Sequence, residues 1–386
     1  MPKSPPVLRA REVAPLLEAQ AERAERERTL PAESVRALAD AGLFRMCLPE
    51  ELGGEAVGFV PAIEAWEEIA RADGSTGWTA MANGSGAGAA GAFLGDDAVR
   101  KVFGEGPAAT VGGQFAPRGS GEIVPGGFRV TGSYSFGSGT AHSGFVSAGF
   151  IPLQDGAPLM APSGLPDMRV GFVPREQVEF TDGWFVMGLQ GTGSYDYEVR
   201  EVFIPEEYSF PLFTKEARRG NPLFRLGMMP FTAAGHAAFA LGVGRRALDE
   251  LHGMAAERQR MGDPTPLAER LTFQKDYAQH EARLRAARLL VLDTFAEAQR
   301  AADAGAPFSL GQRAWLRMGA NLATEVAKEA CDFAHERAGT VAIRPGVLQR
   351  CFRDMHTGSQ HAFIGEKIYT DSAAALLGLV EDVPGL

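Results

Sequence analysis

The sequence has very little cysteine, with only Cys47, Cys331 and Cys351 among 386 residues. These three show no metal-ligand spacing and cannot form a disulfide framework, so they suit a reducing compartment. No apolar run approaches the roughly 20 residues that a membrane-spanning helix requires. The first residues, Met1 to Pro6, lack the apolar core of a signal peptide. We therefore expect a cytoplasmic protein.

Basic residues are also in deficit, because 38 Lys and Arg stand against 48 Asp and Glu, which gives a formal net charge of −10. Nucleic acids and anionic membranes both attract a cationic surface, so we expect neither as a partner. The hydrophobic share of 45% and the charged share of 22% are ordinary for a globular protein. A chain of this length can form two or three cooperating domains with substantial cores.

The order of the expected elements is helix, strand, helix, which indicates an α+β fold without βαβ alternation. Residues 1–108 have helical periodicity, with Pro31 in the first turn of one helix. Residues 109–222 are rich in turns, and Phe128–Phe136 alternates like a strand after the tight turn Gly126-Gly127. Further strands are expected at Phe145–Ile151, Met168–Val173 and Tyr197–Ile204.

Residues 223–386 return to helical periodicity, with two apolar stripes typical of a helix-bundle core. The stripes are Leu284, Ala287, Val291 and Phe295, and Ala323, Val326, Ala327 and Ala330. Their extent exceeds what one antiparallel helix pair would cover, which favours an oligomer. In the first part of the chain, residues 82–92 are almost entirely small. They either let a flat ligand or another backbone approach closely or form a thin helix–helix contact, and both interpretations remain open.

Ser138 lies between two glycines in Phe136-Gly137-Ser138-Gly139, at the end of an expected strand. Such a segment can present a hydroxyl and backbone amides to a flat ring, or it can be a turn that needs glycine for positive φ. Gly191-Thr192-Gly193-Ser194 allows the same two interpretations. It is not a phosphate loop, because no lysine and helix start follow it. Trp184 either packs on a ligand ring or fills the seam between domains, and we favour the seam.

Two of the seven histidines, His356 and His361, lie five residues apart, just after Arg353-Asp354. Histidine is the side chain that titrates near neutral pH without perturbation. Five residues correspond to about 140° around an ideal helix, so the two would not share one face. A third ligand is missing, so we expect no metal site. The other histidines have no comparable context: His142, His236, His252, His280 and His335.

Several segments together resemble the acyl-CoA dehydrogenase superfamily. They are most similar to its two-component (group D) flavin-dependent monooxygenase branch, which includes the oxygenase component of 4-hydroxyphenylacetate hydroxylase and dibenzothiophene monooxygenase. Their order and spacing extend over nearly the whole chain. The segments are Gly42–Gly54, Phe136–Gly139, Gly188–Ser194, Val202–Pro205 and Ala338–Arg350.

The resemblance implies three domains. Residues 1–108 would form an N-terminal helical domain, residues 109–222 a middle β-barrel or sandwich domain, and residues 223–386 a C-terminal four-helix bundle. The bundle would assemble a homotetramer. The expected fold is therefore the acyl-CoA dehydrogenase-like α+β fold.

The resemblance also implies the site residues. In the dehydrogenases a glutamate base often follows the Arg-Asp aspartate by about eight residues, and here that position is Ala362, directly after His361. An imidazole there is typical of the monooxygenases, so His361 would be a general base or a hydrogen-bond partner of the transferred oxygen. Ser138 would hydrogen-bond the flavin near N5. The other implied cofactor-binding residues are Phe136, Gly137, Gly139, Gly191, Thr192, Ser194 and Arg258, and the implied substrate pocket is Trp78, Asn83, His356 and His361.

The implied function is the oxygenase component of a two-component monooxygenase. It would use reduced flavin and O₂ to hydroxylate or oxygenate an aromatic, heteroaromatic or amine small molecule. A separate NAD(P)H:flavin reductase is expected, because the chain has no nicotinamide fingerprint within a βαβ unit. The flavin would be FMN, with FAD as the alternative, since Arg258 resembles a dehydrogenase arginine that contacts the FAD diphosphate across a subunit boundary.

Two departures from the family pattern leave alternatives open. Gly86 stands where some of these monooxygenases have a further histidine, and Gln114 ends a segment where relatives often have a serine. One alternative is an acyl-CoA dehydrogenase whose base lies elsewhere on the bundle, at Glu257, Glu269 or Glu281. Another is a non-catalytic scaffold of the same fold.

Overall fold

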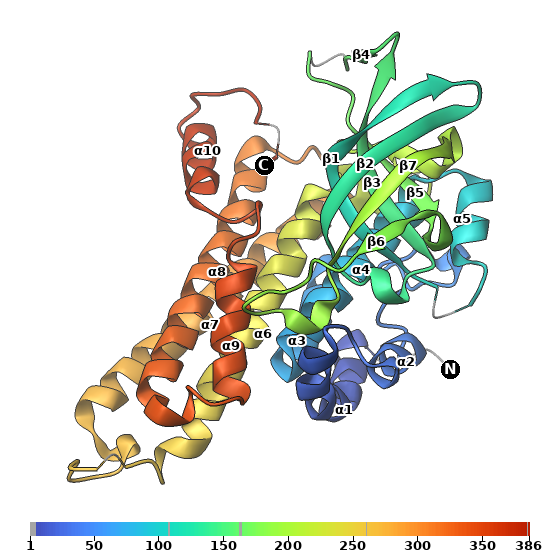
Figure 1. Cartoon of the computed structure of the whole chain (residues 1–386). Helices are drawn as coiled ribbons and strands as arrows, with labels where there is room; N and C mark the ends of the chain where they lie inside the picture. Colours follow the sequence, from blue (N-terminus) through green and yellow to red (C-terminus); the bar gives the residue numbers. More distant parts are fainter. Residues whose placement is uncertain (1–4, 107–108, 162–163, 260, 384) are drawn as a thin grey trace.

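The computed structural model describes residues 5–106, 109–161, 164–259, 261–383 and 385–386. Two expectations fall on residues that are not described. Residues 1–4 belong to the start that was expected to lack a signal peptide, and residue 108 is the expected end of the N-terminal domain. Figure 1 shows N-terminal helices in blue, a β-sheet in green and long helices in yellow to red. The N-terminal helices lie below the sheet and pack along one side of the long helices.

The N-terminal part consists of helices that start at favourable residues. Proline stands in the first turn of α1 and immediately before α2, where its fixed φ suits a helix start. Asp73 caps α4, because its carboxylate accepts a hydrogen bond from the backbone N–H of Thr76. The helices are α1 (Pro6–Glu27), α2 (Ala32–Asp40), α3 (Phe59–Ala72), α4 (Gly74–Phe93) and α5 (Asp96–Phe103).

The small-residue tract lies on α4 and serves packing within the protein. A Cβ at Gly88 would lie 3.0 Å from the Cβ of Cys47, and one at Gly91 would lie 2.6 Å from Leu48. Such distances leave no room for a side chain, so the glycines let neighbouring segments pack closely on the helix. Gly86 itself faces Val111 at the start of the sheet. Of the two interpretations left open, the structure supports the close approach of another backbone, that of residues 47–49, which lie outside the helices.

Among its described residues, the middle part forms one eight-stranded sheet, so the expected β-domain is confirmed. The hairpin between the first two strands turns at Gly126, as predicted, and β1 also pairs with β3 in parallel. The strands follow the order β6-β7-β2-β1-β3-β5-β8, with β4 on β3. Their bounds are β1 (Val111–Val124), β2 (Gly127–Gly137), β3 (Phe145–Gln154), β4 (Ala157–Pro158), β5 (Arg169–Pro174), β6 (Glu179–Thr181), β7 (Tyr195–Pro205) and β8 (Ser209–Pro211).

The C-terminal part is a helical bundle. The two predicted apolar stripes lie on α7 and α8, and all their side chains are buried within this single chain. They therefore give no support for an oligomer, and that part of the argument from sequence is wrong. The helices are α6 (Met229–Ala255), α7 (Leu271–Asp303), α8 (Leu310–Ala338), α9 (Val347–Gly358) and α10 (Glu366–Leu376).

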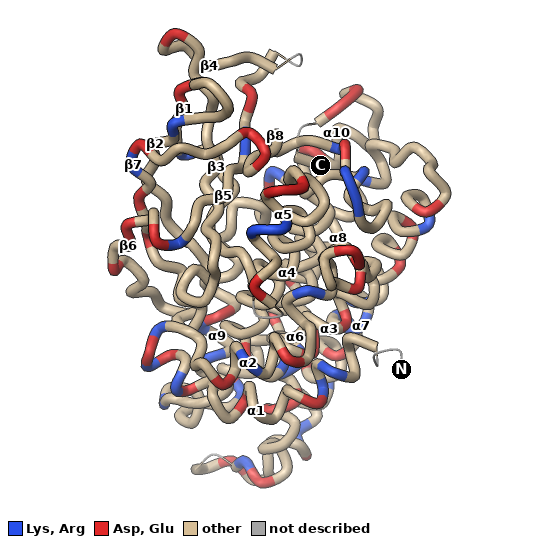
Figure 2. Tube along the Cα trace, turned by 90° about the vertical axis from the view of Figure 1, so that its right-hand side faces the viewer, with Lys and Arg blue, Asp and Glu red and all other residues tan. Residues whose placement is uncertain are grey.

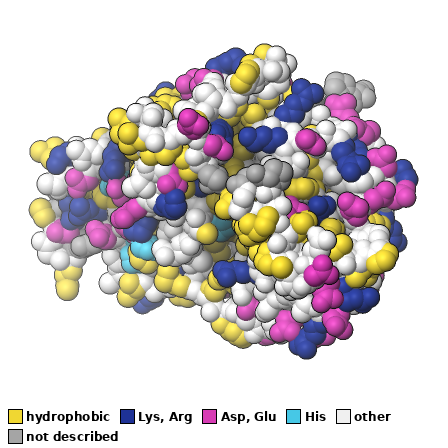
Figure 3. Space-filling model, turned by 90° about the horizontal axis from the view of Figure 1, so that it is seen from above, with side chains coloured by type: hydrophobic (Ala, Val, Ile, Leu, Met, Phe, Trp, Pro, Cys, Tyr) yellow, Lys and Arg dark blue, Asp and Glu magenta, His cyan; other side chains and the backbone are white. Residues whose placement is uncertain are grey.

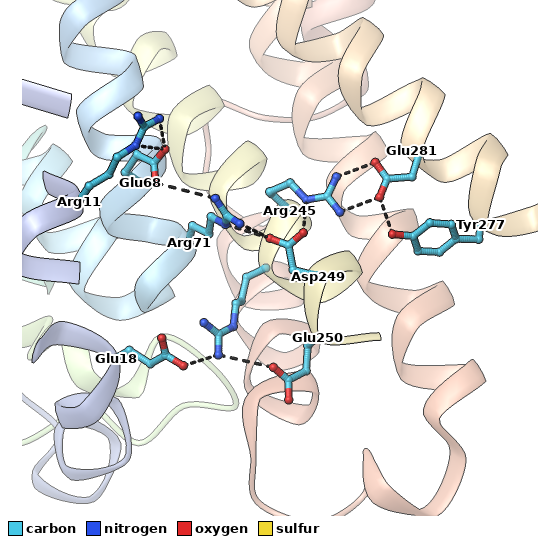
Figure 4. Close-up of polar contacts among 10 residues, drawn as sticks. Arg11, Glu18, Glu68, Arg71, Arg245, Asp249, Glu250, Tyr277 and Glu281 are labelled. Atoms are coloured by element: carbon cyan, nitrogen blue, oxygen red, sulfur yellow. Dashed lines mark hydrogen bonds and ion pairs between the residues drawn. The ribbon is translucent and has the colours of Figure 1, made fainter. Parts of the chain in front are cut away.

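A network of ion pairs attaches the N-terminal helices to the bundle (Figure 4). Arg71 on α3 lies 2.7 Å from Asp249 on α6, and Arg245 on α6 lies 2.6 Å from Glu281 on α7. Glu281 also accepts a hydrogen bond from the hydroxyl of Tyr277. These groups are partly exposed, so each pair contributes little stability, and the network mainly fixes how the helices are placed.

Charged residues of both signs are interspersed over the side of the molecule shown in Figure 2. No continuous basic stripe is visible on that side, in agreement with the net charge of −10. Among the helices of the described residues, none is long and apolar enough to cross a membrane.

Candidate active site

Hydroxyl groups from two distant segments meet where β2 ends and β7 begins. Ser138 follows β2, and its Oγ lies 2.7 Å from Oγ of Ser194, which directly precedes β7. The Oγ of Ser194 lies 2.7 Å from Oγ1 of Thr192, and Thr192 donates to the carbonyl of Leu189 at 2.9 Å. Trp78, on α4, donates its indole N–H to Ser138 at 3.1 Å. The structure thus brings together four of the predicted site residues.

The direction of each hydrogen bond in this hydroxyl chain follows from two groups whose roles are fixed. The Leu189 carbonyl at one end can only accept, and the Trp78 indole N–H at the other end can only donate. Thr192 uses its only hydrogen on the Leu189 carbonyl, so its oxygen accepts from Ser194, and Ser194 in turn accepts from Ser138. Ser138 also accepts from Trp78. A hydroxyl oxygen has two lone pairs, so Ser138 keeps one acceptor site and has no hydrogen left to donate.

The backbone around the hydroxyls is held tightly. A Cβ at Gly139, whose φ is +71°, would lie 2.2 Å from the side-chain oxygen of Asn83. A Cβ at Gly137 would lie 2.8 Å from the Tyr197 ring, and one at Gly191 would lie 2.8 Å from Ala24. The glycines are therefore required where the segments approach one another. Close packing, more than space for a ligand, explains their presence.

Phe136 is the residue that best indicates a bound flat group. It is not a glycine, yet its φ is +66°, and its side chain is 63% exposed beside the hydroxyl chain. A strained backbone that holds an exposed aromatic ring is typical of functional sites. A flavin, with its flat apolar ring and polar edge, fits an exposed phenyl ring next to a hydroxyl acceptor. Trp184 is buried and packs edge-on against Phe136, so it fills the seam, as expected.

His361 lies beyond α9, which ends at Gly358, and is held in a turn by its backbone N–H to the Gly358 carbonyl. The expectation of a helical histidine is therefore wrong, and so is the helical angle between His356 and His361. The Nδ1 of His361 lies 2.9 Å from Nε2 of His236, a buried residue of α6. The Trp78 ring packs edge-on against both imidazoles, at centroid distances of 4.9 Å to His236 and 5.6 Å to His361.

Trp78 therefore joins the two halves of the site, because its N–H reaches the hydroxyl chain and its ring touches the histidine pair. Figure 3, seen from above, is hollowed between the bundle at the left and the β-domain at the right, and histidine side chains are visible in and beside this hollow. The sequence offered one signal for His236, since it is a lone polar residue inside the apolar run from Ala233 to Leu241.

Burial keeps both histidines neutral. It lowers the pKa of His361 to about 4, with a smaller effect of the Arg317 guanidinium, because the charged imidazolium loses its hydration. The pKa of His236 is also lowered, first by burial and then by His361 and Arg317. Arg317 donates to the carbonyl of Phe363 at 3.0 Å, and burial lowers the pKa of this guanidinium to about 10.

Two other predicted pocket residues have partners elsewhere. The Nε2 of His356 lies 2.7 Å from a carboxylate oxygen of Asp332 on α8, so His356 belongs to the bundle surface and not to the pair around His361. Asn83 is fully buried, with its amide donating to the Val111 carbonyl at 2.6 Å and its oxygen 3.0 Å from Nε2 of His142. Asn83 therefore shapes the wall behind Gly139.

Arg258 lies in the connection between α6 and α7, at the end of the bundle remote from the sheet (Figure 1). Its guanidinium is 3.4 Å from the hydroxyl of Thr340. Within one chain it does not meet the hydroxyl chain. Of the three glutamates considered for a relocated base, Glu257 and Glu269 are exposed in the same connection, and Glu281 is paired with Arg245. None of these three carboxylates contacts Trp78, Ser138 or His361.

Asp354 holds the loop before β7 against α9. It is fully buried, and its Oδ1 accepts a 2.6 Å hydrogen bond from the backbone N–H of Leu189, whose φ is +55°. A Cβ at Gly188 would lie 2.1 Å from the Arg353 carbonyl. Burial, together with the nearby Asp73 carboxylate, raises the pKa of Asp354 to about 7. The sequence analysis used Asp354 only to locate the position of the base and assigned no role to its carboxyl group.

Comparison with known proteins agrees with this geometry. Residues 9–106 match the acyl-CoA dehydrogenase N-terminal domain, and residues 234–366 match the acyl-CoA dehydrogenase C-terminal domain. The chain is 31% identical to the indole-3-acetate monooxygenase of Pseudomonas putida over 362 residues, which cover 94% of this chain and 90% of that protein. It is 30% identical to the flavin-dependent monooxygenase oxygenase subunit HsaA of Rhodococcus jostii, over 90% of this chain and 91% of that protein.

A solved structure shows the same architecture. The crystal structure of the 3-HSA hydroxylase from Rhodococcus sp. RHA1 superimposes with a TM-score of 0.91 at 27% identity, over 99% of each chain. Both the sequence and the fold therefore lead to one family. The chain belongs to the acyl-CoA dehydrogenase superfamily, in its flavin-dependent monooxygenase branch.

Proposed function

We propose that this chain is the cytoplasmic oxygenase component of a two-component monooxygenase that inserts one oxygen atom from O₂ into a phenol or a heteroaromatic compound. When bound, reduced flavin supplies the electrons and reacts with O₂. The observation that carries the proposal is the arrangement around Trp78, which places a hydroxyl acceptor, Ser138, and a neutral imidazole, His361, at one site. The relative named as an indole-3-acetate monooxygenase supports an aromatic substrate.

His361 would act on the substrate or on the oxygen that is transferred to it. A phenol has a pKa near roughly 10, as tyrosine does, and it is a much better nucleophile once it is ionised. A neutral imidazole can accept its proton or stabilise the resulting oxygen by a hydrogen bond. The exposed Phe136 ring and the Ser138 oxygen would hold the flavin. FMN is the first choice, and FAD is the alternative, because Arg258 could contact an FAD diphosphate from another copy of the chain.

The test is reconstitution of the purified protein with a generic NADH-dependent flavin reductase, FMN or FAD, and a panel of aromatic compounds. Mass spectrometry should find a product with one added oxygen atom, formed only when both proteins are present. A tightly bound yellow flavin that is bleached by an acyl-CoA would instead indicate a dehydrogenase. Failure to bind flavin in either redox state would indicate a scaffold.

Ser138→Ala should weaken the binding of reduced flavin more than that of oxidised flavin. Reduced flavin carries an N–H at N5, whereas oxidised flavin has only a lone pair there, and Ser138 has only an acceptor site left. The loss of one hydrogen bond is worth roughly 0.5–1.5 kcal/mol, or about two- to tenfold in Kd. Anaerobic titrations of both flavin forms measure this preference.

Ser147→Ala is the matched control, because this buried serine donates to the Gly112 carbonyl within the sheet and does not touch the hydroxyl chain. It should leave the redox preference unchanged. Equal affinities of wild-type protein for the two flavin forms would contradict the assigned direction of the hydroxyl chain.

The protein should assemble as a homotetramer through the bundle. Although the predicted stripes are buried, other large apolar side chains on the bundle remain exposed in the single chain, including Leu289, Trp315 and Ile343. Burial of such side chains between copies is favourable. Light scattering at micromolar concentration should give the mass of four chains, and a monomer would contradict this prediction.

A further inference from the structure

The imidazoles of the buried His236 and the partly buried His361 can share only one hydrogen between them. Nε2 of His236 and Nδ1 of His361 are 2.9 Å apart. In neutral histidine one ring nitrogen carries a hydrogen and the other has a lone pair, so one of the pair donates and the other accepts. Which of them donates decides the state of Nε2 on His361. That nitrogen makes no hydrogen bond within the described residues and is the group left for a ligand.

A second donor settles the direction. The backbone N–H of Phe363 points at Nδ1 of His361, with a nitrogen–nitrogen distance of 3.4 Å. A hydrogen on Nδ1 would then face the hydrogen of Phe363, whereas a lone pair there can accept from His236 at 2.9 Å and be shared with the longer contact from Phe363, so we assign Nδ1 as the acceptor. Arg317 holds this turn in place by donating to the carbonyl of the same residue, Phe363, at 3.0 Å. His236 is therefore the donor, and His361 carries its hydrogen on Nε2.

We propose that His236 is a positioning residue that fixes His361 as a hydrogen-bond donor at Nε2, so that the substrate group facing His361 is an acceptor, the ionised oxygen of a phenol. This inference rests on the proposed function for the identity of the ligand. The assignment of the hydrogens, however, stands on the contacts of His236 and Phe363 alone. A donor at this place stabilises the phenolate that is the reactive form of the substrate, and the proton of the phenol passes to solvent, because Nε2 of His361 has no lone pair to accept it.

The tautomer can be measured without flavin or substrate. In protein labelled with ¹⁵N-histidine, NMR correlations between ring nitrogens and ring protons distinguish a hydrogen on Nε2 from one on Nδ1. We expect His361, assigned by its loss in His361→Ala, to carry the hydrogen on Nε2. A hydrogen on Nδ1 in the wild-type protein would overturn the proposal.

Two variants then test the positioning role. His236→Leu removes the donor, so His361 should populate both tautomers. The pKa of anaerobically bound 4-nitrophenol, read from its phenolate absorbance, should lose its downward shift, and kcat for a phenol should fall about three- to tenfold. His236→Gln retains a side-chain N–H and should restore both properties. If His236→Gln fails to restore the phenolate shift that His236→Leu removes, the role of His236 is only structural.

Failure of this inference can be distinguished from failure of the proposed function. A hydrogen on Nε2 combined with no oxygenation of any aromatic compound would leave the tautomer assignment intact and reject the monooxygenase. Oxygenation combined with a hydrogen on Nδ1 would keep the monooxygenase and reject the positioning role of His236.

Discussion

Replacement of His361 with alanine should lower hydroxylation by about 10²–10⁴-fold, the usual contribution of one positioned acid, base or hydrogen-bond group. The hydroxyl chain around Ser138 does not involve His361, so reduced flavin should still bind and react with O₂. Oxygen consumption should therefore continue while H₂O₂ accumulates in place of product. Product mass spectrometry, an oxygen electrode and a peroxide assay measure the three quantities.

His356→Ala is the matched control, because His356 is bonded to Asp332 and lies away from Trp78. It should lower hydroxylation much less. Because burial lowers the pKa of His361 to about 4, ionisation of this imidazole should not limit activity between about pH 5 and 8. Equal, small losses in both variants, with coupling of O₂ to product intact, would show that His361 is a structural residue.

Asp354→Asn should stabilise the protein at alkaline pH and have little effect at acidic pH. The pKa of this carboxyl is about 7 in the folded protein and near its ordinary value of about 3.9 when unfolded. Between these two values the folded state binds the extra proton, so the free energy of unfolding of the wild type falls as pH rises. The amide keeps an acceptor for the N–H of Leu189 and removes this dependence.

The gain of the variant should grow from about pH 4, level off above about pH 7, and reach at most about 4 kcal/mol, since one pKa unit corresponds to 1.36 kcal/mol. Urea unfolding at about pH 5 and 8 measures it. Asp182→Asn is a control of opposite sign, because its hydrogen bond to Arg28 lowers the pKa of this exposed carboxyl. A gain for Asp354→Asn that does not change with pH would contradict the buried ionisation.

Local signals in the sequence predicted the elements that depend on nearby residues. The strand after Gly126 and the helix after Pro31 follow from turn chemistry and from the fixed φ of proline, and both are present. The sequence also indicates Ser138, Thr192 and Ser194, because their glycine-rich segments resemble those of the family and, for Ser138, because it lies at the end of an expected strand. The sequence did not show why glycines are needed in these segments. The structure shows that close packing excludes a side chain there, as at Gly139 beside Asn83.

The contacts between distant segments could not be read from spacing. His236 and His361 are 125 residues apart, and no periodicity relates them. His356 was expected at the pocket together with His361. Helix α9 ends between the two, so His356 contacts Asp332 whereas His361 contacts His236. The role of Asp354 depends on a loop 165 residues away. Two of these contacts, His236 with His361 and His356 with Asp332, form within the folded bundle, and the contact of Asp354 with Leu189 forms only when the bundle packs against the middle part of the chain.

The central claim is that this chain transfers one atom of O₂ to an aromatic substrate. The most direct test is a reaction of the purified protein, reduced flavin and a phenol under isotopically labelled O₂, followed by mass spectrometry of the product. The label should appear in the new hydroxyl group, and it should be absent when labelled water replaces labelled O₂. A product that takes its oxygen from water, or an oxidised substrate that gains no oxygen, would contradict the account.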